Sequence, residues 1–262
     1  MDTSFNWNGT YYSAANGIQQ SVGARLIESV AIRPDMRILD AGCGSGELTL
    51  LLAKMAPLGH VTAVDLSASM IEKAQKAADI EGLNNCEFFV SDINSLEYDS
   101  QFDLVFSNSV LHWVTEISDG ARRLYRALLT GGLLAVQFPL LNPGHPMIRY
   151  ANRAIKELGL ERCYIGWQFP WYVPESGEQF AGVLEAAGFK DTAARKESGV
   201  FTFPSADSVY KHFDSVGLGL FASPLPEDKK PALKEQVLND LKEDFPGEAS
   251  LVYERLFATA RK

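Results

Sequence analysis

Between residues 36 and 138 the sequence alternates short apolar runs with longer amphipathic stretches. This alternation is typical of βαβ units, in which a helix joins one parallel strand to the next. It predicts five strands and three clear helices between them. The strands are predicted at residues 36–42, 60–65, 86–92, 102–108 and 132–138. We therefore expect an α/β fold built on a mostly parallel sheet.

Local signals place the helix ends in this region. Ser67 is a good N-cap for one helix, and Gly82 is a good C-terminal stop for it. The helix that begins near Glu116 is expected to end at Gly131 and Gly132. A further helix is expected ahead of Pro34, in the first forty residues.

After Phe138 the alternation of strands and helices gives way to proline-rich loops and helices. Proline-rich loops flank a predicted helix at residues 147–159, and another helix is expected near 175–187. Residues 189–203 and 250–262 are interpreted as two final strands. The stretch between these two strands has helical patterns, which predicts a helical cap inserted between them.

Composition and charge restrict the classes of partner. The 262 residues are 46% hydrophobic, which is enough for one sizeable core. The formal net charge is −9 and no run of Lys or Arg occurs, so we expect no nucleic acid and no anionic membrane as partner.

Cysteine usage and the N-terminal sequence bear on the compartment. Cys43, Cys86 and Cys163 lie far apart, which argues against a disulfide framework and against a zinc site. No signal-peptide pattern and no bilayer-spanning stretch is present in the sequence. We predict a cytoplasmic protein with no metal, no membrane insertion and no obligate protein partner.

A glycine-rich segment, DAGCGSGELT, joins the first predicted strand to the first helix. It contains Gly42, Gly44 and Gly46, and glycine allows a backbone to approach a ligand closely at a helix start, where N–H groups are free. The second strand ends in Asp65, where a doubly wound fold has an acidic residue for ribose hydroxyls. Although such a glycine pattern alone can be only a tight turn, this context predicts a nucleotide-like ligand.

The third strand supports the same ligand. It is followed by Asp92, which can accept a hydrogen bond from an adenine amino group, and by Ile93, which can pack on the base. Two ligand classes use this geometry, the nicotinamide dinucleotides and S-adenosylmethionine.

Local charge distinguishes the two ligand classes. Gly46 is followed by Glu47, whose carboxylate at a helix start would repel the pyrophosphate of a dinucleotide. Asp40 adds a second negative charge close to the loop. A cationic sulfonium with an α-ammonium group is attracted by both charges, so the electrostatics favour the methyl donor.

The sequence resembles the class I S-adenosylmethionine-dependent methyltransferases. The segments ILDAGCGSGELT, VTAVDLSASMIEKA, SDI, FDLVFSNSVLHWV and LLTGGLLAVQFP match the motifs of that family in order, over residues 36–139. Within the family it is most similar to the carboxyl O-methyltransferases of the juvenile hormone acid, trans-aconitate and malonyl-thioester groups. Y-x-x-A-N-x-x-Q, from Tyr12 to Gln19, and LHWV resemble the first group, whereas NPGHPMIRYANRA and YERLFATARK resemble the second.

The resemblance implies a Rossmann-like, seven-stranded, mostly parallel sheet whose last strand is antiparallel, with a helical cap. It implies one methyltransferase domain over residues 1–262, with an N-terminal helical lid at 1–34 and a donor-binding core at 35–140. Lid loops, the last two strands and a cap insertion around 203–247 make up 141–262. The implied donor is S-adenosyl-L-methionine and the product S-adenosyl-L-homocysteine. The residues implied for donor binding are Tyr12, Asp40, Gly42, Gly44, Gly46, Asp65, Leu66, Met70, Asp92, Ile93 and Asn108.

The segment after the fourth strand suggests how an acceptor is held. Strand ends open into the ligand crevice of such a sheet, and here they present His112 and Trp113. A carboxylate is ionised near neutral pH, so its methylation needs orientation rather than a strong base. We predict Gln19 and Trp113 as hydrogen-bond donors to the acceptor carboxylate, with His112 as a third donor or a support.

Each of these residues has a competing structural interpretation. Trp113 can be core packing, His112 can merely satisfy a neighbour, and Gln19 can be an exposed helix residue. The aromatic segment at residues 163–173 either lines an acceptor pocket or fills the core of the cap. We expect an apolar organic acid as acceptor, rather than a tricarboxylate.

Three alternatives remain at this point. The acceptor atom can be nitrogen or carbon, or a phenol oxygen, and a carbon or phenol acceptor would need a base such as His112. The protein can instead be a nicotinamide-dependent oxidoreductase, or a donor-binding module without catalysis.

Overall fold

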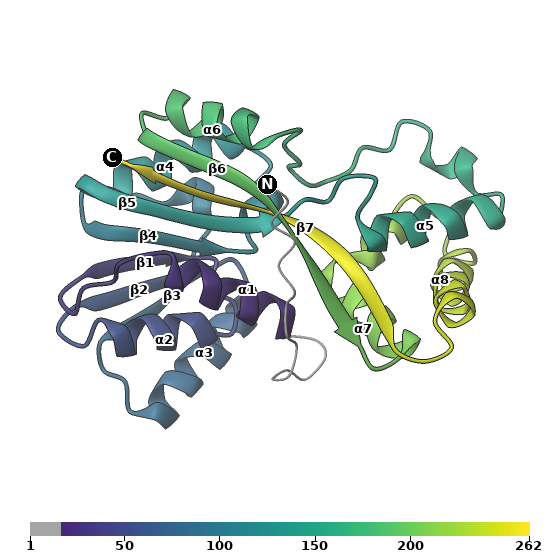
Figure 1. The fold of residues 1–262 in the computed structure, drawn as a ribbon, viewed down its shortest axis with the longest axis horizontal. Coiled ribbons are helices and arrows are strands. Elements are labelled where there is room, and N and C mark those ends of the chain that lie inside the picture. The colour runs from purple at the N-terminus through teal and green to yellow at the C-terminus, as the bar shows by residue number, and fades with distance from the viewer. Residues whose placement is uncertain (1–16) are drawn as a thin grey trace. The chain divides into compact units, whose positions relative to one another are not determined.

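The computed structural model describes residues 17–262, and these form a seven-stranded sheet flanked by helices (Figure 1). The strand order across the sheet is β3-β2-β1-β4-β5-β7-β6. The strands are β1 (Arg37–Ala41), β2 (His60–Asp65), β3 (Cys86–Val90), β4 (Phe102–Asn108), β5 (Leu128–Pro139), β6 (Lys190–Phe203) and β7 (Ala249–Arg261). Strands β1 to β5 pair in parallel, whereas β7 runs antiparallel to β5.

Eight α-helices occur in the described residues. They are α1 (Gly17–Glu28), α2 (Glu47–Met55), α3 (Ala68–Glu81), α4 (Ile117–Ala127), α5 (Pro146–Glu157), α6 (Gly177–Ala186), α7 (Ala206–Val216) and α8 (Lys230–Asp244). Four short 3₁₀ turns are η1 (Ile93–Ser95), η2 (Leu111–Trp113), η3 (Glu161–Tyr164) and η4 (Leu218–Ala222).

Strand β1 lies inside the sheet, between β2 and β4. Leu39 of β1 pairs with Val105 of β4, and both side chains are fully buried. Strands covered on both faces are apolar at successive positions rather than at alternate ones, which explains the continuous apolar runs. Because these strands are parallel, their carboxyl ends meet at one edge, where the polar residues Asp65 and Asn108 leave the core.

The predicted sheet is confirmed. The strands lie within a few residues of their predicted positions, the antiparallel last strand is present, and helices α7 and α8 occupy the stretch between β6 and β7. The expected helix ahead of Pro34 is α1, and Gly82 is the left-handed C-cap of α3.

The predicted end of α4 is wrong. The helix stops at Ala127, and residues from Leu128 onward belong to β5, so Gly131 and Gly132 lie in a strand. Leu128 pairs with Phe102 of β4, and the Gly131 N–H donates to the carbonyl of Lys262 at 2.8 Å. These contacts are long-range, so they override the local helical pattern.

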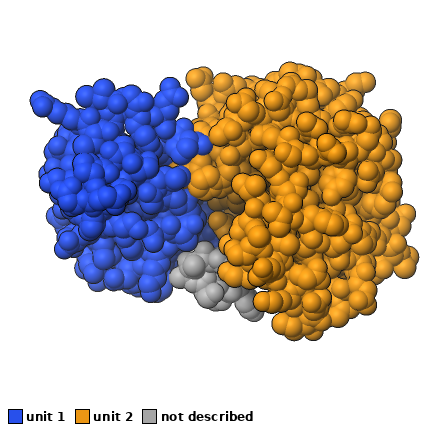
Figure 2. Space-filling view, turned by 180° about the vertical axis from the view of Figure 1, so that it is seen from behind, with its two compact units in different colours: residues 1–18, 140–170, 197–254 blue, residues 19–139, 171–196, 255–262 orange. Residues whose placement is uncertain are grey.

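The chain divides into two compact units (Figure 2). Unit 1 comprises residues 1–18, 140–170 and 197–254, and unit 2 comprises residues 19–139, 171–196 and 255–262. Unit 2 therefore holds β1 to β5 with their helices, and β6 and β7 each contribute residues to both units. The single domain and its internal boundaries stay predictions.

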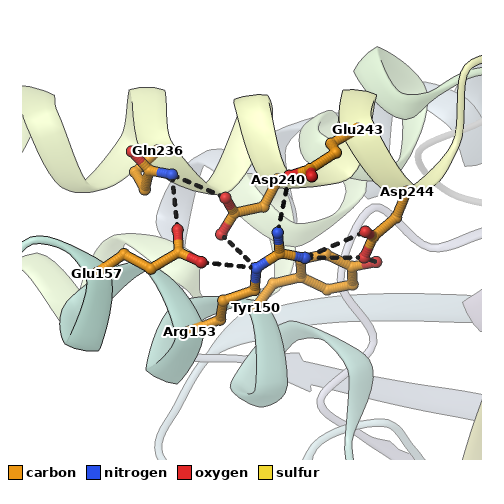
Figure 3. A network of polar contacts seen from close by, with 7 residues as sticks. All are labelled: Tyr150, Arg153, Glu157, Gln236, Asp240, Glu243 and Asp244. Atoms are coloured by element: carbon orange, nitrogen blue, oxygen red, sulfur yellow. Dashed lines mark hydrogen bonds and ion pairs between the residues drawn. The ribbon is translucent and has the colours of Figure 1, made fainter.

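Unit 1 is held together by packing between helices and by one polar network. Helices α5 and α8 face each other, and Arg153 of α5 contacts carboxylates of α8 (Figure 3).

Across residues 17–262, no helix combines the length and the hydrophobicity needed to cross a membrane. The same residues contain no group of three or more His, Cys, Asp or Glu side chains arranged to hold a metal ion.

Candidate active site

The glycine loop follows β1 and precedes α2, as predicted. Gly42, Gly44 and Gly46 have φ angles of 88°, 55° and 92°, in the left-handed region that favours glycine. A side chain at Gly42 would also meet Val110 at 2.2 Å, and one at Gly46 would meet Ala74 at 2.8 Å. The backbone conformation favours glycine at all three positions, and close packing requires it at Gly42 and Gly46 as well.

Asp65 ties the end of β2 to this loop. Its carboxylate accepts hydrogen bonds from the Gly44 N–H and from the Ser67 N–H, each at 2.9 Å. The N–H groups of Gly42 and Cys43 donate to the Val64 carbonyl. The half-buried Asp65 carboxylate therefore lies directly beside the glycine loop, and its contact with a ribose stays a prediction.

Asp40 lies beneath the loop and is 1% exposed. The Thr49 hydroxyl on α2 donates to its carboxylate at 2.6 Å. Burial raises the pKa of the Asp40 carboxyl to about 7, and the negative charge of Asp65 raises it further while the Thr49 hydrogen bond opposes the shift. The charge predicted to attract a cationic donor is therefore pH-dependent near neutrality.

The residues predicted around the adenosine lie on the segments that follow β2 and β3. Asp92 is exposed and caps η1 by accepting from the Asn94 N–H at 2.9 Å, whereas Ile93 is only 5% exposed. Leu66 and Met70 are exposed apolar side chains, Leu66 to 71%. The contact of these residues with a donor stays a prediction, and Tyr12 lies outside the described residues.

Asn108 ends β4 and touches the N-terminal helix. Its side-chain N–H group donates to the backbone carbonyl of Gln19 on α1 at 3.1 Å, and its side-chain oxygen accepts from Gln137 of β5. The structure thus brings together two predicted site residues that are 89 positions apart in the chain. The side chain of Gln19 is half-buried.

Three residues near Asn108 escaped the sequence prediction: Ser109, Gln137 and Arg255. Gln137 is fully buried, although it stands in an apolar run, and Arg255 is 5% exposed. A signal for Arg255 existed, since it follows Ala249, Leu251 and Tyr253 in the inward phase of β7. A buried cation at a strand position predicts polar partners, but the sequence does not name them.

His112 and Trp113 differ in exposure although they are adjacent in η2. His112 is 4% exposed, and Trp113 is 45% exposed. Trp113 packs edge-to-face against Trp171 with ring centroids 5.2 Å apart, and the Tyr172 N–H donates to the His112 carbonyl at 2.8 Å. The burial of His112 favours a supporting role, whereas the indole of Trp113 is accessible.

The aromatic segment at residues 163–173 divides between the two units. Trp171 and Tyr172 pack with unit 2, beside η2 and Phe180 of α6. Trp167 and Phe169 belong to unit 1 and pack around Phe221, with centroids 5.3–5.6 Å apart. Trp167 and Phe169 are half-buried, so they cover Phe221 from one side, and whether they line an acceptor pocket stays a prediction.

Comparisons with known proteins agree with this geometry. Residues 32–169 match the family described as Methyltransferase domain, which is more than half of the chain. A trans-aconitate 2-methyltransferase of Escherichia coli O157:H7 (strain EC4115 / EHEC) is 27% identical over 98% of each chain. A second, from Enterobacter sp. (strain 638), is 31% identical over 61% of this chain and 65% of the relative. In fold, the YcgJ protein from Bacillus subtilis is similar with a TM-score of 0.64, at 16% identity and over 93% of this chain and 98% of the other.

The residues present fit S-adenosylmethionine as the donor. The left-handed glycine loop leads into a helix start, an acidic side chain ends β2, and Glu47 in the first turn of α2 adds negative charge where a phosphate would be repelled. These features disfavour the nicotinamide-dependent alternative. The chain belongs to the Methyltransferase domain family, and it is an S-adenosylmethionine-dependent small-molecule methyltransferase.

Proposed function

We propose that this methyltransferase O-methylates a carboxylate of a small organic acid that has an apolar part. The observation that carries the proposal is the accessible indole of Trp113 in η2, packed edge-to-face on Trp171 just after β4, the strand that ends at Asn108. The similarity to trans-aconitate 2-methyltransferases over nearly the full length supports a carboxylate acceptor.

Methylation of a carboxylate requires the protein mainly to orient the two reactants. S-adenosylmethionine supplies an electrophilic methyl group on a sulfonium, and a carboxylate oxygen is already a sufficient nucleophile near neutral pH. The indole N–H of Trp113 and the side-chain amide of Gln19 donate hydrogen bonds to this carboxylate. They hold one oxygen in line with the methyl group, so the entropy cost of orienting the two reactants is met on binding and not in the transition state.

His112 acts as a support for Trp113 in this account. Its ring lies 5.2 Å from the Trp113 ring and is almost fully buried. A carbon or phenol acceptor would instead need a base with access to the acceptor, and burial of His112 argues against that role.

Two kinds of acid are the candidates for the acceptor. The exposed aromatic surface of Trp113 favours an acid with an apolar part next to the carboxylate. The similarity to trans-aconitate 2-methyltransferases favours a polycarboxylic acid as second candidate.

The test uses methyl-deuterated S-adenosylmethionine with a pooled panel of trans-aconitate, fatty acids, isoprenoid acids, amines and phenols. Label on an acid that mild alkali releases as methanol is the expected result. Label that resists alkali would move the acceptor to nitrogen, carbon or a phenol oxygen and overturn the proposal.

Two variants then test the roles of the donors. Gln19→Ala removes the side-chain amide but keeps the backbone carbonyl that Asn108 uses, and Trp113→Phe keeps the ring packing but loses the N–H. We expect each to lose about tenfold or more in kcat/KM with S-adenosylhomocysteine affinity unchanged. Gln75→Ala, an exposed glutamine on α3, is the matched control. Full activity in both variants would contradict the assigned roles.

A further inference from the structure

A chain of side-chain hydrogen bonds runs from β7 to the N-terminal helix through unit 2. Arg255 Nε donates to Gln137 Oε1 at 2.7 Å, and Gln137 Nε2 donates to Asn108 Oδ1. Asn108 Nδ2 then donates to the Gln19 carbonyl at 3.1 Å. The chain crosses three strands, β7, β5 and β4, and ends on α1.

The direction of this chain is set at its Arg255 end. Each amide side chain contains both a donor and an acceptor, so Gln137 and Asn108 can take either of two orientations. Arginine has donors only, which forces the Gln137 oxygen toward Arg255 and its N–H group toward Asn108. Asn108 must then present its own N–H group to Gln19. In the reverse orientation two oxygens, Asn108 Oδ1 and the Gln19 carbonyl, would face each other.

Arg255 also holds the turn that follows β4. Ser109 has φ 60°, a left-handed conformation that is uncommon outside glycine. Its hydroxyl accepts from Arg255 Nη2 at 2.6 Å and from Gln137 Nε2 at 2.8 Å, and its N–H donates to the Gln137 carbonyl at 2.7 Å. The residue after it, Val110, lies against Gly42 of the glycine loop.

The hydrogen-bond chain ends on α1, at the place where this helix packs against Asn108 and α2. A Cβ on Gly23 of α1 would be 3.1 Å from the side chain of Asn108 and 2.2 Å from Leu48 of α2. Helix α1 thus packs closely on Asn108 and on the helix that begins at the loop. A change in the orientation of Asn108 would therefore alter both the packing and the hydrogen bond that α1 makes with it.

We propose that Arg255 is the positioning residue of the donor site. It fixes the orientation of two amides and the left-handed turn at Ser109, and thereby seats α1 and the residue 108–110 segment beside the glycine loop. It acts through Gln137, Asn108 and Ser109, and touches no reacting atom. The proposal concerns the donor side and stands whichever acceptor is methylated.

The first test compares Arg255→Met with Arg261→Met, a control at an exposed arginine on the same strand. We expect amide hydrogen exchange in α1 to become about tenfold faster in Arg255→Met, relative to α6, with S-adenosylhomocysteine binding about tenfold weaker by calorimetry. Arg261→Met should leave both values unchanged. Arg255→Lys keeps a donor-only side chain for Gln137 but loses the fork that also reaches Ser109, so it should restore only part of the loss.

A second variant separates direction from mere packing. Gln137→Glu is nearly isosteric and keeps an acceptor for Arg255, but it removes the donor to Asn108. We expect it to loosen α1 and weaken S-adenosylhomocysteine binding about as much as Arg255→Met does, even where the strands stay intact. If Arg255→Met does not fold, this variant and Arg255→Lys decide the question.

Two results would overturn the proposal. One is an increase of hydrogen exchange in Arg255→Met that is spread evenly over α1 and α6. The other is S-adenosylhomocysteine affinity of Gln137→Glu equal to that of the unaltered protein. Because neither measurement uses an acceptor, a failure here is distinct from a failure to methylate a carboxylate.

Discussion

Two arginines, one in each unit, organise polar networks in different ways. In unit 1, Arg153 of α5 faces Glu157 on its own helix and Asp240, Glu243 and Asp244 on α8, at 2.8–3.5 Å (Figure 3). In unit 2, Arg255 acts on Gln137 and Ser109. The first arrangement depends on balancing charge, and the second on the direction of hydrogen bonds.

The difference determines how each network responds to pH. Hydrogen bonds from Tyr150 and Arg153 lower the pKa of Asp244, and Arg153 lowers the pKa of Glu157. Burial has the opposite effect on Asp240, whose pKa is raised. The amides and the hydroxyl that Arg255 orients do not titrate, so the positioning of α1 is insensitive to pH by this route. A charge cluster suits a structural clamp, whereas a fixed hydrogen-bond direction suits a binding site.

Breaking the clamp in unit 1 is expected to have the largest effect on stability. Arg153→Met leaves the Asp240 carboxylate, 2% exposed, without its cationic partner; because Arg153 itself is 34% exposed, the loss should be about 2 kcal/mol of unfolding free energy. Urea unfolding measures this cost. Arg149→Met, at an exposed arginine on the same helix, is the control and should change stability by less than about 0.5 kcal/mol. A loss of S-adenosylhomocysteine affinity in Arg153→Met as large as that in Arg255→Met would erase the contrast between the two arginines.

Asp40 gives unit 2 a pH dependence opposite in sign to that of Asp244 and Glu157. Its pKa is raised from 3.8 to about 7, so the native state holds the extra proton and loses stability as pH rises through that window. The lowered pKa values of Asp244 and Glu157 contribute stability that is lost as pH falls. Asp40→Asn should remove most of the decline of stability between these two pH values, because asparagine does not ionise. If the unfolding free energy of the variant and of the unaltered protein changed with pH in the same way, the raised pKa of Asp40 would be contradicted.

Gly23→Ala sharpens the account of α1. The new methyl group would crowd Leu48 and Asn108, and should cost about 1 kcal/mol of stability, with weaker S-adenosylhomocysteine binding. Calorimetry and urea unfolding on the same samples measure both. Unchanged binding would mean that the seating of α1 on Asn108 does not matter to the donor.

The same substitution elsewhere should have the smallest effect and the opposite sign. Gly182 lies in α6, where a Cβ would meet nothing within 4 Å. Gly182→Ala should stabilise the protein by about 0.5 kcal/mol, because alanine has the higher helix propensity, and should leave donor binding unchanged. A destabilised Gly182→Ala would show that crowding does not explain the Gly23 result.

The sequence was informative where local pattern and strand ends coincide. The sequence correctly predicts Asp65 and Asn108 at the carboxyl edge of the sheet, because apolar runs end there and parallel strands share that edge. The end of α4 was mispredicted because the pairing of Leu128 with Phe102 is long-range.

The partners of Arg255 could not be read from sequence for the same reason. They depend on the antiparallel register of β7 against β5, in which Pro139 lies opposite Arg255 and Gln137 lies opposite Phe257. The alternation of β7 shows that Arg255 points inward, but only the register brings it to Gln137. Chain direction and register are properties of the assembled sheet.

The central claim is that α1 belongs to the donor site and is seated by the chain from Arg255. The most direct test is hydrogen exchange of the unaltered protein with and without S-adenosylhomocysteine. The account predicts that the ligand slows exchange in Gly17–Glu28 by about tenfold more than in the α6 segment Gly177–Ala186. Equal slowing in the two helices, or no slowing in α1, would contradict it.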